Sequence, residues 1–191
     1  MSREGALRTA INLLNMPSHV RAHRKLPLPD GTELILAIAA GDPAAHQEAA
    51  SLIDRPKAQI QAAAGFFVEQ ILLSPDSDSY RILGARTDAA PEVLRNHMAL
   101  IMRWLHPDLH PNDIRSVHAQ RVVSAWDDLK TPEKRQVYDA ARLARSANAR
   151  SRKGGPHLRS KTHPGRPVGP RWSDGKSGVL LRRVLAYFSK I

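Results

Sequence analysis

The apolar positions of residues 1–75 recur every three or four residues and predict a series of short helices. Residues 32–40 predict a buried helix that ends at Gly41, although so short an apolar run could also form a strand. Asp42 and Pro43 have the residue types of a helix N-cap and first turn, and another helix follows Pro56. That last helix would carry its apolar residues on one face: Ile60, Ala64, Phe67 and Ile71. Together the segments predict a small N-terminal helical bundle.

A second series of helices is predicted for residues 76–142, after a polar linker at 74–78. Apolar residues from Val93 onward follow helical spacing until Pro107, which ends the helix because the residue before a proline is driven out of the helical region. A further amphipathic helix is predicted over 114–129. The two helices would form an antiparallel finger with an exposed loop at its tip.

Residues 76–142 resemble a J domain through five motifs in the right order and spacing. In chain order these are Asp78-Ser79-Tyr80-Arg81-Ile82-Leu83-Gly84, Ala89-Ala90-Pro91-Glu92, His106-Pro107-Asp108, Ala125-Trp126-Asp127-Asp128-Leu129 and Glu133-Lys134-Arg135-Gln136-Val137-Tyr138-Asp139. The three-residue motif alone would indicate only a turn that ends a helix. The whole pattern resembles an all-α J domain. Because neither a glycine/phenylalanine-rich linker nor a cysteine-rich module follows it, the chain is similar to the specialised class that keeps only this domain.

The resemblance implies a co-chaperone that stimulates the ATPase of a DnaK-type chaperone and directs it to a client. In that family the His106-Pro107-Asp108 loop docks on the partner's nucleotide-binding domain. The carboxylate of Asp108 suits a charge-assisted hydrogen bond from a partner arginine, and Pro107 restricts the backbone before binding. His106 can donate from one ring nitrogen while the other anchors the loop. The further chaperone contacts that we expect are basic: Arg95, Arg103, Lys134 and Arg135.

The predicted helix before the loop departs from the family, which usually carries a dense basic row there. Only Arg95 and Arg103 are basic, whereas Val93, Leu100 and Trp104 form an apolar stripe. An apolar stripe on an open surface would favour aggregation. We therefore expect the N-terminal bundle to cover it. Direct contact with a client or a specialised chaperone is the alternative. The missing charges also fit a degenerate J domain that acts as a scaffold without ATPase stimulation.

The composition excludes several classes of site and function. The chain has 191 residues, of which 42% are hydrophobic but only 5% aromatic, and this favours close-packed aliphatic helices. It has no cysteine, which excludes disulfides, thiol catalysis and cysteine-ligated zinc. We find no catalytic motif and no tight histidine pair, so we expect no enzyme, cofactor or metal site. No secretory signal or long apolar run is present, which favours a cytoplasmic protein.

The positive charge is concentrated in the C-terminal part. Residues 1–139 hold 16 Lys and Arg against 17 Asp and Glu, whereas residues 140–191 hold 13 against 1. We predict a disordered basic linker over 143–177 and an amphipathic helix over 178–191. These segments suit contact with an anionic membrane surface or nucleic acid, which would make the protein an adapter at such a surface. The helix equally suits docking on the chain's own bundle.

Overall fold

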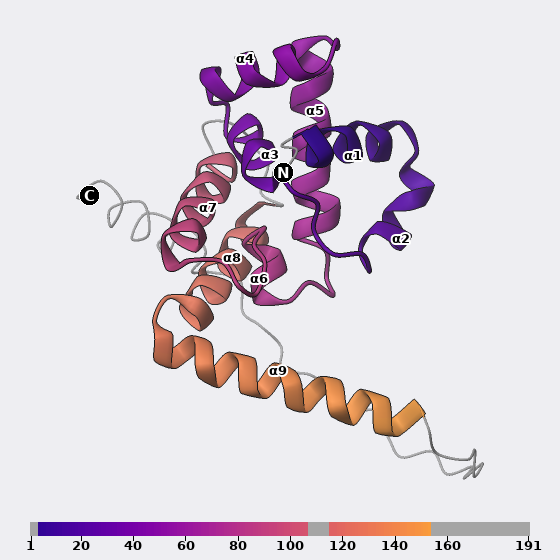
Figure 1. Ribbon diagram of the computed structural model, residues 1–191. Helices are drawn as coiled ribbons and strands as arrows, with labels where there is room; N and C mark the ends of the chain where they lie inside the picture. The colour runs from indigo at the N-terminus through magenta and orange to yellow at the C-terminus, as the bar shows by residue number, and fades with distance from the viewer. Residues whose placement is uncertain (1–3, 107–114, 154–191) are drawn as a thin grey trace. The chain divides into compact units, whose positions relative to one another are not determined.

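The computed structural model describes residues 4–106 and 115–153, and this part of the chain is all-α, without strands (Figure 1). Its elements in chain order are α1 (Glu4–Asn15), η1 (Pro17–His19), α2 (Val20–His23), α3 (Thr32–Ala39), α4 (Pro43–Leu52), α5 (Lys57–Phe67), the π-helical turn η2 (Val68–Leu72), α6 (Ser79–Ile82), α7 (Pro91–Trp104), α8 (Arg115–Leu129) and α9 (Pro132–Lys153). Contacts within the chain divide it into two units, residues 1–136 and residues 137–191. The all-α fold predicted from the sequence is confirmed.

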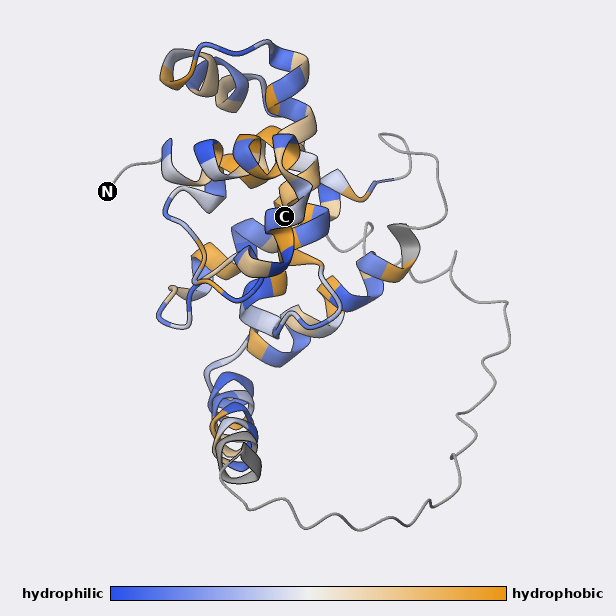
Figure 2. Ribbon diagram, turned by 90° about the vertical axis from the view of Figure 1, so that its right-hand side faces the viewer, coloured by the Kyte–Doolittle hydropathy of each residue, from blue (hydrophilic) through white to orange (hydrophobic). Residues whose placement is uncertain are grey.

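Helix α3 lies at the centre of the first unit, where it contacts α1, α4, α5 and α7. Most of its residues are buried, and Ile35 and Ile38 are completely buried. Residues 32–39, which include most of the apolar run 34–40, therefore form a buried helix rather than a strand. Apolar residues of the surrounding helices face the same core, as the hydropathy colouring shows (Figure 2).

Local signals set the starts of the neighbouring helices. The side chain of Asp42 accepts hydrogen bonds from the backbone N–H of Ala44 (2.8 Å) and Ala45 (3.4 Å), and Pro43 occupies the first turn of α4. This is the N-cap that the sequence predicts. Helix α5 begins after Pro56, as expected, and its predicted apolar face is buried: Ile60, Ala64, Phe67 and Ile71.

The three helices α6, α7 and α8 belong to the same unit as the N-terminal bundle. Helix α8 packs against both α6 and α7. The hydroxyl of Ser79 donates to the carboxylate of Asp128 across 2.7 Å, which ties the start of α6 to the end of α8. The side chain of Asp78 caps α6 by accepting from the backbone N–H of Arg81 (2.9 Å).

The predicted linker 74–78 is a packed turn. Ser74 is buried, and its backbone oxygen accepts a 2.7 Å hydrogen bond from Arg121 of α8. The same guanidinium donates to the backbone oxygen of Leu73 (2.6 Å). Because buried backbone oxygens need hydrogen-bond partners, Arg121 fixes this turn to α8. The sequence-predicted boundary at residue 75 therefore lies in a turn that is exposed at Pro75 and Asp76 and tied to α8 through Leu73 and Ser74.

Helix α9 extends to Lys153, beyond residue 143, where the sequence analysis begins the basic linker. Its second half is rich in alanine and arginine, both strong helix formers. The rest of the predicted linker (154–177) and the predicted helix 178–191 lie outside the described residues. Among the described helices, none combines the length and apolar character needed to cross a membrane.

Candidate functional site

Helix α7 has one buried face and one open face. Leu94, Met98, Ile101 and Leu105 point into the core of the first unit. Apart from Pro91 at the start, the exposed residues of the helix lie on its other side: Glu92, Val93, Arg95, Asn96 and Arg103. This division follows from the helical spacing of its apolar positions.

The open face carries the two basic residues that the sequence analysis assigns to this helix. Arg95 and Arg103 are both exposed and lie two helical turns apart, with half-buried Ala99 between them. Leu105 ends the helix, and the half-buried His106 follows directly, with its backbone N–H bonded to the oxygen of Arg103 (3.1 Å). Arg95, Arg103 and His106 therefore form a row along α7, which we call the α7 row. Pro107 and Asp108, the next two residues of the predicted site, lie outside the described residues.

The two basic residues expected at the start of α9 differ in their surroundings. Lys134 is exposed. Arg135 is half-buried, donates to the hydroxyl of Tyr80 (2.8 Å) and to the backbone oxygen of Thr87 (2.7 Å), and lies over the Tyr80 ring at 5.4 Å. These contacts anchor the start of α9 to α6 and to the loop after it. Arg135 thus has a structural role, and its role in chaperone binding stays a prediction.

The N-terminal bundle covers part of the predicted apolar stripe. Trp104 is only 3% exposed, and its Nε1 lies 3.7 Å from the position that a Cβ atom would take on Gly65 of α5. Leu100 is half-buried, whereas Val93 is 39% exposed. Coverage by the bundle is thus confirmed for Trp104 and wrong for Val93, because Val93 lies in the first turn of α7 beside an open pocket.

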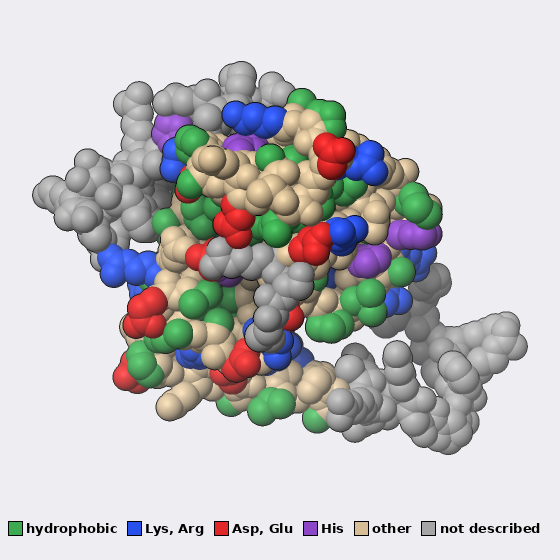
Figure 3. Space-filling view, turned by 45° about the horizontal axis from the view of Figure 1, so that its top comes forward, with side chains coloured by type: hydrophobic (Ala, Val, Ile, Leu, Met, Phe, Trp, Pro, Cys, Tyr) green, Lys and Arg blue, Asp and Glu red, His purple; other side chains and the backbone are tan. Residues whose placement is uncertain are grey.

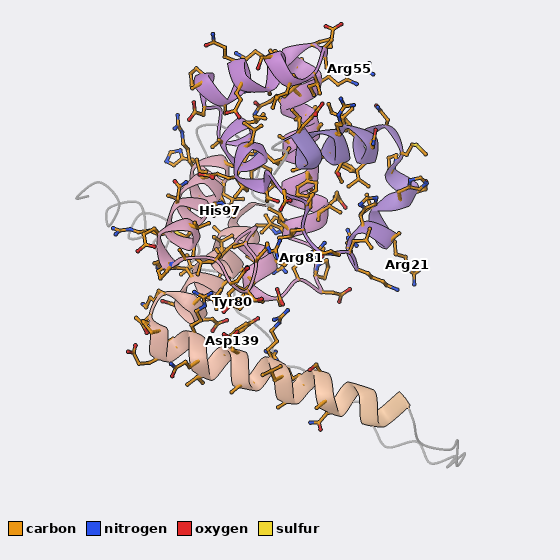
Figure 4. The ribbon with its side chains drawn as sticks, in the orientation of Figure 1. Arg21, Arg55, Tyr80, Arg81, His97 and Asp139 are labelled. Atoms are coloured by element: carbon orange, nitrogen blue, oxygen red, sulfur yellow. The ribbon has the colours of Figure 1, made fainter. Side chains whose placement is uncertain are left out.

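A buried histidine lies on the bundle-facing side of α7. His97 is 4% exposed, and its Nδ1 lies 3.0 Å from the backbone oxygen of Leu83 (Figure 4). A carbonyl oxygen only accepts, so Nδ1 carries the proton and Nε2 is the unprotonated nitrogen. Burial lowers the pKa of His97, although the bond to Leu83 and the charge of Glu33 oppose this shift. His97 is therefore neutral near pH 7.

The lowered pKa of His97 predicts a loss of stability in acid. The unfolded chain takes up this proton near the ordinary histidine pKa of about 6.5, whereas the folded chain does so only at lower pH. As the pH falls below about 6.5, the free energy of unfolding should decrease through this group by at most about 1.4 kcal/mol per pH unit. Urea unfolding of the wild type and a His97→Asn variant at several pH values measures this decrease. Equal pH dependence in the two proteins would show that His97 is not the group responsible.

The anchoring roles of three arginines could not be predicted from the sequence, which indicates Arg135 only as an expected chaperone contact. Arg121 fixes the turn after η2, Arg135 holds the start of α9, and Arg81 donates to the backbone oxygens of Leu26 (2.8 Å) and His23 (3.0 Å) (Figure 4). Each reaches a backbone oxygen far away in the sequence. In a single sequence such an arginine looks the same as a solvated one, so no local pattern marks these three.

Comparisons with known proteins relate a third of the chain to DnaJ chaperones. Over 63 residues it is 33% identical to chaperone protein DnaJ 2 of Streptomyces avermitilis, a match covering 33% of this chain and 17% of that protein. Chaperone protein DnaJ 1 of Mycobacterium leprae is 34% identical over 67 residues, covering 35% and 17% of the two chains. DnaJ 2 of Cutibacterium acnes is 38% identical over 68 residues, covering 35% and 18%.

These matches span less than a fifth of the length of the curated relatives. No family model matches the chain, and no solved structure matches it either. The similarity to DnaJ proteins and the all-α fold agree with the resemblance found in the sequence. About one third of this chain fits the J-domain, DnaJ-like family.

Proposed function

We propose that this protein is a J-domain co-chaperone that stimulates ATP hydrolysis by a DnaK-type chaperone and directs that chaperone to a particular client. The observation that carries the proposal is the α7 row, in which two exposed arginines lead to His106. The similarity of a third of the chain to DnaJ proteins supports the same function.

The charges of the α7 row suit an electrostatic contact with the proposed chaperone partner. Arg95 and Arg103 present positive charge on the open face, where a negatively charged partner surface can meet them. Beyond His106, the carboxylate of Asp108 would accept a charge-assisted hydrogen bond from a partner arginine. No bond is formed or broken on this chain, because the partner hydrolyses ATP. The co-chaperone only favours the hydrolysing conformation of its partner by binding to it.

The exposed arginines offer a direct test of this surface. An Arg95→Ala/Arg103→Ala double variant should bind the ATP-loaded chaperone about threefold to tenfold more weakly, since each exposed ion pair contributes roughly 0.2–1 kcal/mol. Biolayer interferometry with the host's DnaK-type chaperone in ATP measures the dissociation constant.

Two arginines of the bundle provide the matched control. Arg21 and Arg55 are also exposed but lie on α2 and just before α5 (Figure 4). An Arg21→Ala/Arg55→Ala variant removes the same charge away from the α7 row and should bind as the wild type does. Equal weakening of both variants would indicate a non-specific charge effect, and wild-type affinity in both would exclude the α7 row as the contact.

A degenerate J domain acting as a scaffold is the second candidate. The open face of α7 carries only two basic residues, which favours weak electrostatic steering toward a chaperone. A scaffold would bind its partners without changing the rate of ATP hydrolysis. An adapter at a membrane or nucleic-acid surface would rest on the predicted basic linker 143–177 and the predicted helix 178–191, of which residues 154–191 lie outside the described residues.

A further inference from the structure

The stretch from Met16 to Leu26, which comprises η1 and α2, lies at the surface of the N-terminal bundle (Figure 1). The turn η1 has no buried residue, and α2 has one, Val20. At the two ends of the stretch, Met16 and Leu26 are large apolar side chains that are each 49% exposed. The stretch therefore contributes little to the core and presents most of its side chains to the solvent.

The same stretch is positively charged. Residues 5–29 hold four Lys and Arg but neither Asp nor Glu, and three of the cations lie in α2 or directly after it: Arg21, Arg24 and Lys25. Within the described part of the chain, none of these three forms an ion pair, and η2, which contacts α2, adds only the carboxylate of Glu69. Figure 3 shows basic, histidine and apolar side chains gathered at the right-hand edge, over η1 and α2. This part of the bundle therefore has a positive potential.

Two arginines fix the backbone of the stretch to the rest of the first unit. Arg24 donates to the backbone oxygen (2.8 Å) and to the side-chain oxygen (3.0 Å) of Gln70. Arg81 of α6 donates to the backbone oxygens of His23 (3.0 Å) and Leu26 (2.8 Å). The acceptors of Arg24 are uncharged, so they hold its guanidinium without cancelling the positive charge. The exposed side chains thus stand on an ordered backbone, which lowers the entropy cost of binding a partner.

The exposed apolar and cationic side chains of this stretch together form what we call the α2 surface: Met16, Arg21, Lys25 and Leu26. A protein segment can use both kinds of group, because its carboxylates pair with the cations and its apolar side chains cover the exposed methionine and leucine. Methionine in particular adapts its shape to different apolar partners. Duplex nucleic acid would use only the cations. Attachment to an anionic membrane needs more cations and a larger inserted apolar face.

We propose that the α2 surface binds an acidic segment of another protein, in which apolar residues lie next to the carboxylates. The identification of this partner as a client rests on the proposed function. The binding itself requires neither the chaperone nor ATP. The α2 surface and the α7 row share no residue, so the client and the chaperone would contact different side chains.

Titration of the full chain with two peptides at physiological salt tests the proposal. The probes are acetyl-Gly-Leu-Glu-Asp-Glu-Leu-Gly-amide and the same peptide with glutamine and asparagine in place of glutamate and aspartate. The chain has four methionines, so the ¹³C-methyl signal of Met16 can be followed by itself. This signal should shift in a saturable way with the acidic peptide only, while those of the buried Met98 and Met102 stay in place. No shift of the Met16 signal, or an equal shift with the amide peptide, would overturn the proposal.

Matched charge removals locate the binding. An Arg21→Ala/Lys25→Ala variant should bind the acidic peptide about fivefold more weakly, within the range for two exposed ion pairs. An Arg55→Ala/Lys57→Ala variant removes the same exposed charges at the start of α5, away from α2 (Figure 4), and should bind normally. Equal affinity in both variants would contradict the site. A shift of the Met16 signal with phosphatidylserine vesicles or duplex DNA, but not with the peptide, would contradict a protein partner.

These titrations contain no chaperone, so their outcome is independent of the ATPase measurement. A chain that binds the acidic peptide at the α2 surface without stimulating ATP hydrolysis would keep this inference and lose the proposed function. The opposite pair of results would keep the proposed function and remove the α2 surface as a site for an acidic client.

Discussion

An Asp108→Asn variant should lose nearly all stimulation of a DnaK-type ATPase while keeping the stability of the wild type. Asparagine has the size and shape of aspartate but lacks the negative charge that a partner arginine would bind. A charge-assisted hydrogen bond contributes roughly 1.5–3 kcal/mol, so stimulation should fall about 10-fold to 100-fold. The rate of a single turnover of ATP on the chaperone, with saturating wild type or variant, gives this ratio.

An aspartate-to-asparagine substitution outside the loop tests whether the loss of stimulation is specific to Asp108. Asp76 is exposed in the turn before α6, and an Asp76→Asn variant should stimulate as the wild type does. If Asp108→Asn retained full stimulation, the loop would not be the contact that triggers hydrolysis. The scaffold function would then be favoured.

A Trp104→Glu variant should be several kcal/mol less stable than the wild type. Trp104 of α7 is 3% exposed and lies close to Gly65 of α5 in the bundle. The substitution removes a large buried ring and places an unpaired carboxylate in its position, which together lower the free energy of unfolding by roughly 3–5 kcal/mol. Urea unfolding followed by circular dichroism at 222 nm measures this change.

Val93 provides the control on the same helix. It is 39% exposed, and Val93→Glu introduces the same carboxylate in the first turn, where the helix dipole favours negative charge. Its free energy of unfolding should stay within about 0.5 kcal/mol of the wild type. A Trp104→Glu variant that is equally stable would show that the bundle does not cover this end of α7 in solution.

Much of the fold could be predicted because helices carry local signals. The apolar faces of α5 and α7, the cap at Asp42 and the proline before α5 are all visible in the sequence. The burial of Trp104 followed from a physical argument, since an apolar stripe on a helix needs a cover. The α7 row could be predicted because helical spacing places Arg95 and Arg103 on one side.

The long-range contacts could not be predicted. Arg81 and Arg121 bind backbone oxygens of other segments, and only the folded chain brings these groups together. The pocket beside Val93 has the same origin, because its lining residues come from separate segments of the chain. Helix α9 is longer than predicted, because the alanines and arginines of its second half favour a helix.

We propose that this chain activates a DnaK-type ATPase. The most direct measurement is the single-turnover rate of ATP hydrolysis by the host's own DnaK-type chaperone as the concentration of the full chain is raised. The rate constant should increase and then saturate, because stimulation requires a binary complex. A rate constant that stays at the basal value at every concentration, with each such chaperone of the host, would contradict the account.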